Sequence, residues 1–100
     1  MSRFDHTAID DVIHGRLRLG IMAYLSTVSP APFVELKAKV NATDGNLSTH
    51  LSKLEEAGYV RIEKTLAGKK PLTLVHLTKS GRAAWIAYLN RIQALIRAAE

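Results

Sequence analysis

Residues 43–60 read TDGNLSTHLSKLEEAGYV, and this stretch decides the fold. Thr43 is a residue type that caps the start of a helix, and Gly58 suits the left-handed position just after a helix end. Between them three leucines recur at helical spacing and predict one buried stripe: Leu47, Leu51 and Leu54. We therefore expect an amphipathic helix that follows Thr43, reaches Ala57 and has a polar face opposite the leucines.

A shorter helix is predicted immediately upstream, from Phe33 to Val40. Pro32 is well placed at a helix start, and Phe33, Leu36 and Val40 share one apolar face. Only residues 41–43 connect this helix to the next one. Two short helices joined by a tight turn are typical of a helix-turn-helix, whose second helix can enter the major groove of DNA.

The N-terminal part of the chain predicts a further helix over about residues 7–28. Thr7 would be its N-cap, and Asp10 would lie in the first turn, where the helix dipole favours an acid. Glycine is unfavourable inside a helix, so we expect a break at residues 14–15 and a fresh helix after it. The two prolines within residues 29–32 end this segment.

After the first stretch the hydrophobic period changes from about 3.6 residues to about 2. The run Tyr59–Lys64 alternates apolar and charged side chains, as a half-buried strand does. Residues 65–71 predict a loop, and residues 72–77 predict a second strand that pairs antiparallel with the first. Thr78 would then cap a final helix over Lys79–Ala99.

Composition and charge narrow the class of protein. The chain has 100 residues, 47% hydrophobic and 23% charged, which suits one globular domain. Its net charge is +5, and residues 61–82 alone hold six basic side chains against one acid. This concentration indicates a polyanionic partner, with a solubilising loop as the alternative. No apolar run is long enough to span a bilayer and no signal peptide opens the chain, so we expect a cytoplasmic protein.

Several kinds of chemistry are excluded or disfavoured. The absence of cysteine excludes disulfides, thiolate catalysis and cysteine-ligated metals. The four histidines form no pair at a metal-binding helical spacing, and adjacent acids at residues 10–11 and 55–56 would point about 100° apart on a helix. The sequence has neither a glycine-rich phosphate loop nor a nucleophile elbow. We expect no enzyme, no metal site and no cofactor.

Candidate DNA contacts lie on the polar face of the second helix and on the hairpin. A glycine and small polar side chains allow close approach to bases, whereas basic side chains neutralise phosphates. The helix candidates are Gly45, Asn46, Ser48, Thr49, His50 and Lys53. The hairpin candidates are Lys69 and Lys70 at the tip, with Arg61 and Lys64 as supporting phosphate contacts. Each residue alone is as well explained as ordinary surface, and only their combination favours DNA binding.

Residues 43–60 resemble the recognition helix of small winged-helix transcriptional regulators of the MarR and ArsR superfamilies, and of related stand-alone proteins of similar length. The LTxxGR pattern at residues 77–82 and the run IHGRLRLGIMAYL at residues 13–25 extend the resemblance over nearly the whole chain. The resemblance implies an α+β, mainly α fold: a winged helix-turn-helix with a two-stranded basic wing and a long C-terminal helix. It also implies a homodimer on double-stranded DNA, with Lys69 and Lys70 at the wing tip. The residues it places in the major groove are Gly45, Asn46, Ser48, Thr49 and Lys53.

We expect a single domain over residues 1–100, in which residues 1–15 and the helix over residues 79–99 also serve dimerisation. The last helix carries an apolar side that approximates an a/d seam over two heptads. The candidate interface residues are Ile9, Val12, Ile13, Trp85, Tyr88, Leu89, Ile92, Leu95 and Ile96. The alternative is that all of them belong to the domain's own core.

The sequence therefore predicts sequence-specific binding of double-stranded DNA by a homodimeric transcriptional regulator, and the habit of the family favours repression. One alternative is a winged-helix protein-interaction module in a larger assembly, for which apolar residues would be expected in place of the wing lysines. RNA binding is disfavoured because the major groove of duplex RNA is too narrow for a helix. The sequence identifies neither an operator nor an effector ligand.

Overall fold

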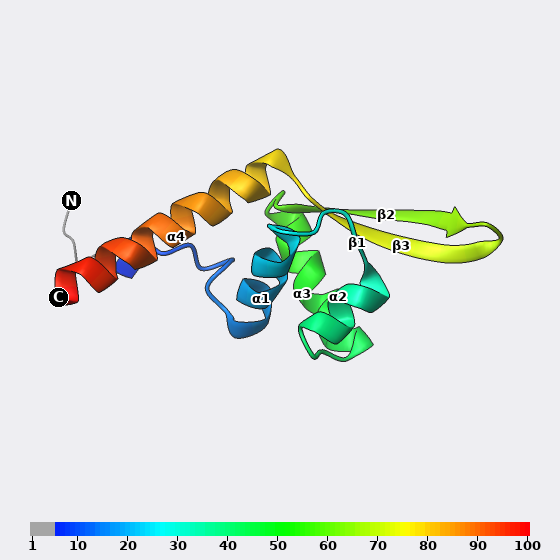
Figure 1. The fold of residues 1–100 in the computed structure, drawn as a ribbon, viewed down its shortest axis with the longest axis horizontal. Helices are drawn as coiled ribbons and strands as arrows, with labels where there is room; N and C mark the ends of the chain where they lie inside the picture. The colour runs from blue at the N-terminus through cyan, green and yellow to red at the C-terminus, as the bar shows by residue number, and fades with distance from the viewer. Residues whose placement is uncertain (1–5) are drawn as a thin grey trace.

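The computed structural model describes residues 6–100, and its helices form a body from which a hairpin and a long helix leave in opposite directions (Figure 1). In chain order the elements are η1 (His6–Ala8), α1 (Arg16–Leu25), β1 (Ala31–Pro32), α2 (Phe33–Lys39), α3 (Asp44–Glu56), β2 (Val60–Ala67), β3 (Lys70–Leu77) and α4 (Lys79–Ala99). The described chain measures 54 × 24 × 21 Å along its principal axes. In this elongated shape the hairpin, α3 and α4 each expose much surface.

The predicted helix after Thr43 is confirmed together with both of its caps. The Thr43 hydroxyl oxygen accepts a hydrogen bond from the backbone N–H of Asn46 at 3.1 Å. Gly58 has a φ of +81°, the left-handed conformation that ends a helix. Asn41 also has a positive φ, of 54°, which lets the chain turn sharply between α2 and α3. The helix-turn-helix therefore follows from local signals in the sequence.

One hydrophobic core lies between the helices and the inner end of the sheet. The predicted leucine stripe of α3 is confirmed, because Leu47, Leu51 and Leu54 are all buried. They pack with other buried apolar side chains: Ile13, Ile21, Met22, Leu25, Ala31, Leu36, Val60, Val75, Trp85 and Tyr88. Burial of apolar surface of this kind is the main stabilising contribution to a domain of this size, and here it fixes α3 by its inner face only.

The sheet has three antiparallel strands in the order β1-β3-β2. The predicted hairpin is confirmed, but the predicted loop over residues 65–71 is wrong. The strands stay paired as far as Ala67 and Lys70, so the turn contains only Gly68 and Lys69. Gly68 has a φ of +65°, which a two-residue turn of the II′ type needs at its first central position. The result is a long ribbon, residues 60–77, which we call the wing.

The predicted helix over the N-terminal segment is wrong before residue 16, although α1 does begin at Arg16 as expected. The Asp10 carboxylate accepts the backbone N–H of Val12 at 2.8 Å and so forms a local turn that competes with a helix. Gly15 is extended, with a φ of −153°. Residues 1–5, which belong to the segment expected to serve dimerisation, lie outside the described residues.

The start of α4 packs against the residues that follow α3, and hydrogen bonds hold it there. The predicted cap is confirmed, because the Thr78 hydroxyl oxygen accepts the backbone N–H of Gly81 at 2.9 Å. The same hydroxyl donates to the carbonyl oxygen of Gly58 at 2.6 Å. A Cβ at Gly81 would overlap the carbonyl oxygen of Tyr59, so only glycine fits there. Within residues 6–100 no helix is long and apolar enough to cross a membrane.

Candidate nucleic-acid interface

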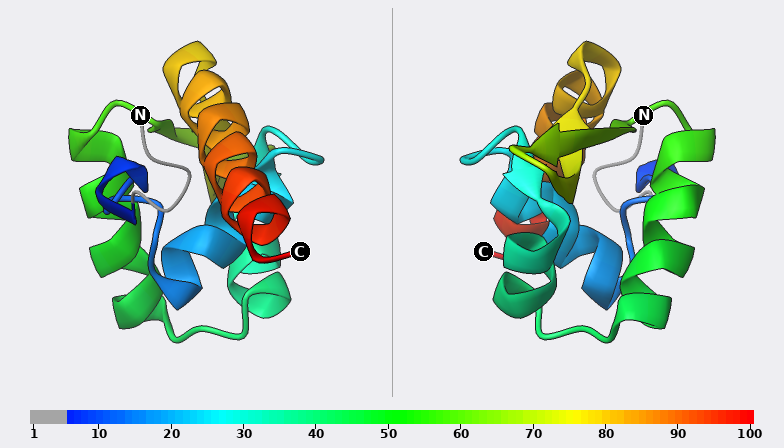
Figure 2. Two further views of the ribbon diagram at one scale, coloured as in Figure 1. Left: turned by 90° about the vertical axis from the view of Figure 1, so that its left-hand side faces the viewer. Right: turned by 90° about the vertical axis from the view of Figure 1, so that its right-hand side faces the viewer.

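α3 lies at the outer edge of the helical body in both end-on views, with one side facing away from the core (Figure 2). Five of the six helix candidates are exposed on it: Gly45, Asn46, Ser48, Thr49 and Lys53. A Cβ built at Gly45 would meet nothing within 4 Å. Packing within the chain therefore does not require glycine at this position. The open surface beside it leaves room for another molecule to approach the backbone.

His50 is the helix candidate that the structure places differently. It is half-buried, and its Nδ1 lies 3.1 Å from Nη1 of Arg18 on α1. A guanidinium only donates, so Nδ1 accepts and the ring proton lies on Nε2. Burial lowers the pKa of His50, and the positive charges of Arg18 and Lys53 lower it further. The imidazole of His50 is thus bonded to α1 through Nδ1, whereas the other five candidates on α3 are exposed.

The two basic candidates on β2, Arg61 and Lys64, lie on opposite faces of the wing. Residues alternate along a strand, and Ile62 packs against the core, so Lys64 lies on the same face as Ile62. Lys64 lines a groove between the wing and α3 together with Ser48 and Ser52 of α3. Arg61 lies on the opposite face, directly across from His76 of β3. The structure therefore brings Lys64 to the α3 side and does not bring Arg61 there.

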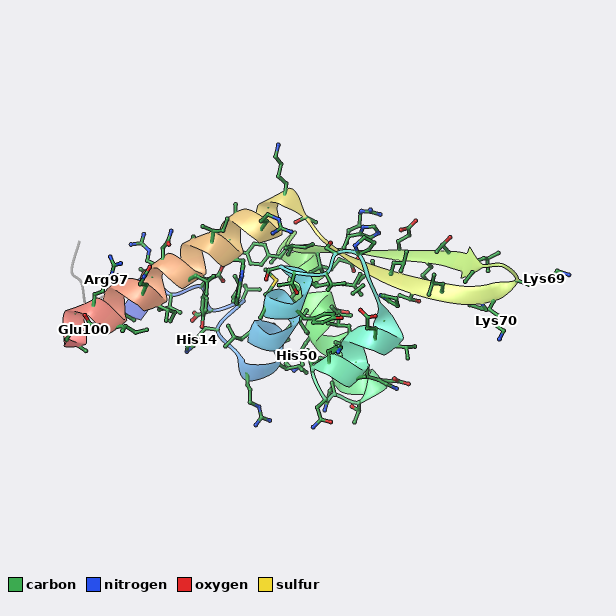
Figure 3. All side chains as sticks on the ribbon, viewed as in Figure 1. His14, His50, Lys69, Lys70, Arg97 and Glu100 are labelled. Atoms are coloured by element: carbon green, nitrogen blue, oxygen red, sulfur yellow. The ribbon has the colours of Figure 1, made fainter. Side chains whose placement is uncertain are left out.

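The tip of the wing carries the two predicted lysines, and both are exposed. Figure 3 shows Lys69 extending beyond the tip and Lys70 projecting downward from the side of the wing. The wing thus holds two ammonium groups far from the helical body. The only acid of the wing, Glu63, pairs with His76 at 2.7 Å on the Arg61 face. It therefore does not neutralise the lysines at the tip.

A second groove runs along the N-terminal end of α3, where sequence reasoning placed no basic residue. It is lined by Arg16 of α1 and Lys39 of α2 as well as by Thr43 and Asn46. Both basic side chains are exposed. They come from two other elements, so only the folded chain brings them beside Asn46. Their position extends the basic surface around α3 to the end opposite the wing groove.

The candidate interface residues separate into buried and exposed groups. Ile13, Trp85 and Tyr88 are buried in the core of the single chain, and the Trp85 and Tyr88 rings stack at 5.7 Å. Four more are partly covered by the same chain: Ile9, Val12, Ile92 and Leu95. Leu89 and Ile96 are 45% and 57% exposed, and Ile86, which was not predicted, is 53% exposed beside them. These three form the apolar strip of α4 that is open to a partner.

Within residues 6–100 no group of three or more His, Asp or Glu side chains could hold a metal ion. The groove between the wing and α3 combines hydrogen-bonding side chains of α3 with Lys64 of the wing and with one acid, Glu55. Such a surface can bind a polyanion and present donors and acceptors to it, as protein surfaces that contact DNA do.

A helix-turn-helix followed by a two-stranded wing defines a winged-helix protein. The winged helix DNA-binding domain family matches residues 17–96, and the chain belongs to this family. The predicted fold class is thereby confirmed.

The chain is also similar to individual proteins from other organisms. The chain is 37% identical over 84 residues to an uncharacterized protein of Methanocaldococcus jannaschii, covering 84% of this chain and 91% of that protein. It is also similar to the transcriptional regulator homologue protein from Pyrococcus horikoshii OT3, with 29% identity, a TM-score of 0.90, and 100% and 99% of the two chains covered. A MarR-family transcriptional regulator from Silicibacter pomeroyi shares the fold, with a TM-score of 0.69 and 23% identity over 88% of this chain and 58% of that one.

Proposed function

We propose that this protein is a homodimeric transcriptional regulator that binds a specific site on double-stranded DNA and represses transcription by occluding a promoter. One observation carries the proposal: Ser48 and Ser52 on the exposed polar face of α3 line one groove with Lys64 of the wing, with Glu55 as the acid in that groove. Membership of a DNA-binding family supports it. The helix supplies side chains for bases, and the wing supplies charge for phosphates.

Sequence choice is assigned to the N-terminal half of α3. The Asn46 side chain is exposed, and an amide can donate and accept at once, the pattern that adenine presents in the major groove. Ser48 and Thr49 follow it on the exposed surface and can contact either bases or phosphates. Gly45 allows the backbone of α3 to come close to the DNA.

Affinity is assigned mainly to the cations around this helix. Lys53 and Lys64 flank the exposed face of α3, and Lys69 and Lys70 reach outward along the duplex. Each phosphate that such a group neutralises releases counterions, so binding weakens as salt rises. Arg16 and Lys39 extend this set at the other end of α3.

The apolar strip of α4 supports the proposed dimer. Ile86, Leu89 and Ile96 lie on one side of the helix, at spacings near those of a coiled-coil seam. A two-fold contact through α4 would present two copies of α3 to one duplex, as half-sites about one helical turn (~34 Å) apart require. A molecular mass of one chain at micromolar concentration would contradict this part of the proposal.

Mobility shift with duplex DNA from upstream of the protein's own gene tests the DNA-binding part. We expect a retarded complex that survives competition by unrelated duplex and weakens as salt rises. Repression is tested by transcription in vitro from the bound promoter, where added protein should reduce the transcript. The proposal fails if no duplex is bound more tightly than by an acidic control protein.

A further inference from the structure

Arg18 of α1 connects three parts of the chain through one guanidinium group. Its Nε donates to the carbonyl oxygen of Val12 at 2.5 Å, and its Nη1 lies 3.1 Å from Nδ1 of His50 on α3. Arg18 is half-buried, and burial of a charged group is costly unless hydrogen bonds replace its contacts with water. One side chain therefore holds together the segment before α1, α1 itself and the middle of α3.

The position of His50 suits it to fix the rotation of α3 about its own axis. The buried leucines hold the inner face of α3, whereas His50 lies on the flank of the helix that meets α1 (Figure 3). Asn46 comes four residues before His50 and Lys53 three residues after it, so both are its neighbours on the helix surface. A bond at His50 therefore helps to set the direction in which the exposed side chains of Asn46 and Lys53 point.

The bond between Arg18 and His50 requires a neutral imidazole. A guanidinium has donors but no acceptor, so Nδ1 must be unprotonated. Charged groups from each side line the groove at this junction: Arg18 from α1, Asp11 from the segment before α1, and Lys53 and Glu56 from α3. Burial, and after it the charges of Arg18 and Lys53, lower the pKa of His50 from its ordinary 6.5. Protonation of His50 would break the bond and place two cations against each other.

We propose that Arg18 is a positioning residue for DNA recognition: its bond to neutral His50 sets the rotation of α3 in the major groove, and protonation of His50 releases α3. This inference rests on the proposed function and adds control by acid to it. Loss of the bond should disturb contacts to bases, which carry the sequence information, more than contacts to phosphates. Acid should therefore lower the preference for the specific duplex, while the added charge on His50 sustains sequence-independent binding.

The test is the ratio of two affinities, one for the specific duplex and one for an unrelated duplex. Arg18→Met keeps much of the length of the side chain and removes its donors, so the ratio at neutral pH should fall about tenfold, as for one mismatched base pair. Arg16→Met is the matched control, because Arg16 is an exposed cation two residues earlier on the same helix. It should lower both affinities alike and leave the ratio unchanged. Partial unfolding would also lower both alike, so the ratio separates positioning from stability.

His50→Asn provides the conservative rescue. The side-chain carbonyl oxygen of asparagine is as many bonds from the backbone as Nδ1 of histidine, and it accepts a hydrogen bond at any pH. This variant should keep the native ratio at neutral pH. Unlike the native protein, it should also keep that ratio as the pH falls. Equal sensitivity to acid in His50→Asn and in the native protein would overturn the inference.

NMR of the histidine rings without DNA provides a readout that does not depend on the proposed function. His50 of the native protein should carry its proton on Nε2 and become charged only below pH 6.5, and Arg18→Met should raise the pH of that change. The affinity ratio is then measured across the pH range in which the His50 ring titrates. The inference is overturned if Arg18→Met leaves the ratio unchanged, or if the native ratio stays constant while His50 becomes charged. A native protein that binds both duplexes equally at neutral pH would instead refute the proposed function.

Discussion

The hydroxyl of Tyr59 donates a 2.5 Å hydrogen bond to Oδ2 of Asp10. Tyr59 immediately follows the turn that ends α3, and the other carboxylate oxygen of Asp10 holds the N-terminal turn through Val12. This bond therefore ties the N-terminal segment to the base of the proposed recognition helix. The hydrogen bond to Asp10 is the main cause that raises the pKa of Tyr59 to about 12, and burial and the carboxylate charge add to it.

Replacement of Tyr59 by phenylalanine should lower the free energy of unfolding by about 1 kcal/mol at neutral pH, because a hydrogen bond to a charged acceptor is lost. The native pKa is raised from 10.0 to about 12, so the stabilisation is complete below pH 10 and is lost as the pH rises toward 12. Urea unfolding at pH 7 and above pH 10 measures both effects.

Tyr24→Phe is the matched control for this change. The Tyr24 hydroxyl also donates to a carboxylate, that of Glu35 at 2.6 Å, but this pair is exposed. Solvent competes for such a bond, so the control should unfold nearly like the native protein. Equal losses in the two variants would contradict the assigned role of the Tyr59–Asp10 bond.

Gly81→Ala should be strongly destabilising even though alanine is the better helix former. The added methyl group would overlap the carbonyl oxygen of Tyr59 and lie 2.9 Å from Cδ1 of Leu77. We expect a loss of about 2–3 kcal/mol, the cost of overpacking a rigid contact. Differential scanning calorimetry measures it, and an unchanged melting temperature would show that α4 can move away from the α3–β2 junction.

Gly45→Ala should leave the stability of the fold intact but weaken DNA binding. Its methyl group would meet no atom of the chain within 4 Å, so the fold should be retained or gain up to about 1 kcal/mol from helix propensity. DNA affinity should nevertheless fall, because the methyl group occupies the space through which the duplex approaches α3. Unfolding and mobility shift on the same preparation separate the two effects, and unaltered DNA affinity would place the duplex away from the start of α3.

Lys69→Ala combined with Lys70→Ala should flatten the log–log dependence of affinity on salt by up to about 2, since each lysine that contacts a phosphate contributes about 1. Arg61→Ala removes a cation from the inner end of the wing, six residues before Ala67 at the tip, and is the control for the two lysines at the tip. Its effect on the slope should be smaller than that of either lysine. A larger effect for Arg61 would mean that the inner end of the wing, and not its tip, contacts the phosphates.

Leu89→Asp should convert the proposed dimer to single chains, because a carboxylate would be buried in the apolar strip of α4. Val34→Asp is the control, since Val34 is 72% exposed on α2 and lies outside that strip. Sedimentation equilibrium at micromolar concentration gives the two masses. A native mass of one chain, or equal masses for native protein and Leu89→Asp, would remove the strip from the interface.

The features that could be predicted from the sequence are those with local causes. Thr43, Gly58 and Thr78 act on backbone atoms a few residues away, so their residue types and spacing sufficed to locate the ends of α3 and the start of α4. The helix predicted around Asp10 was wrong, also for a local cause. The Asp10 side chain accepts backbone N–H groups in a short turn as readily as in a helix. The predicted loop at the wing tip was too long. A glycine and a proline also suit a two-residue turn with Gly68 in the turn and Pro71 in the paired strand.

The candidate site was predicted only as a set of residues, because its geometry depends on partners distant in the sequence. Nothing near His50 in the sequence shows that Arg18 holds its imidazole. The opposite placement of Arg61 and Lys64 follows from which strand face meets the core. Arg16 and Lys39 were missed because they become neighbours of Asn46 only when three helices pack together.

The central claim is that α3 chooses the sequence while the wing supplies affinity. The most direct measurement is selection of bound duplexes from a random library by native protein, by Asn46→Ala, and by Lys69→Ala with Lys70→Ala. The native protein should enrich two related half-sites about one helical turn (~34 Å) apart. Asn46→Ala should lose preference at particular base pairs, and the lysine variant should enrich the same sequence with weaker binding. The claim is contradicted if Asn46→Ala selects the native sequence unchanged while the lysine variant selects a different one.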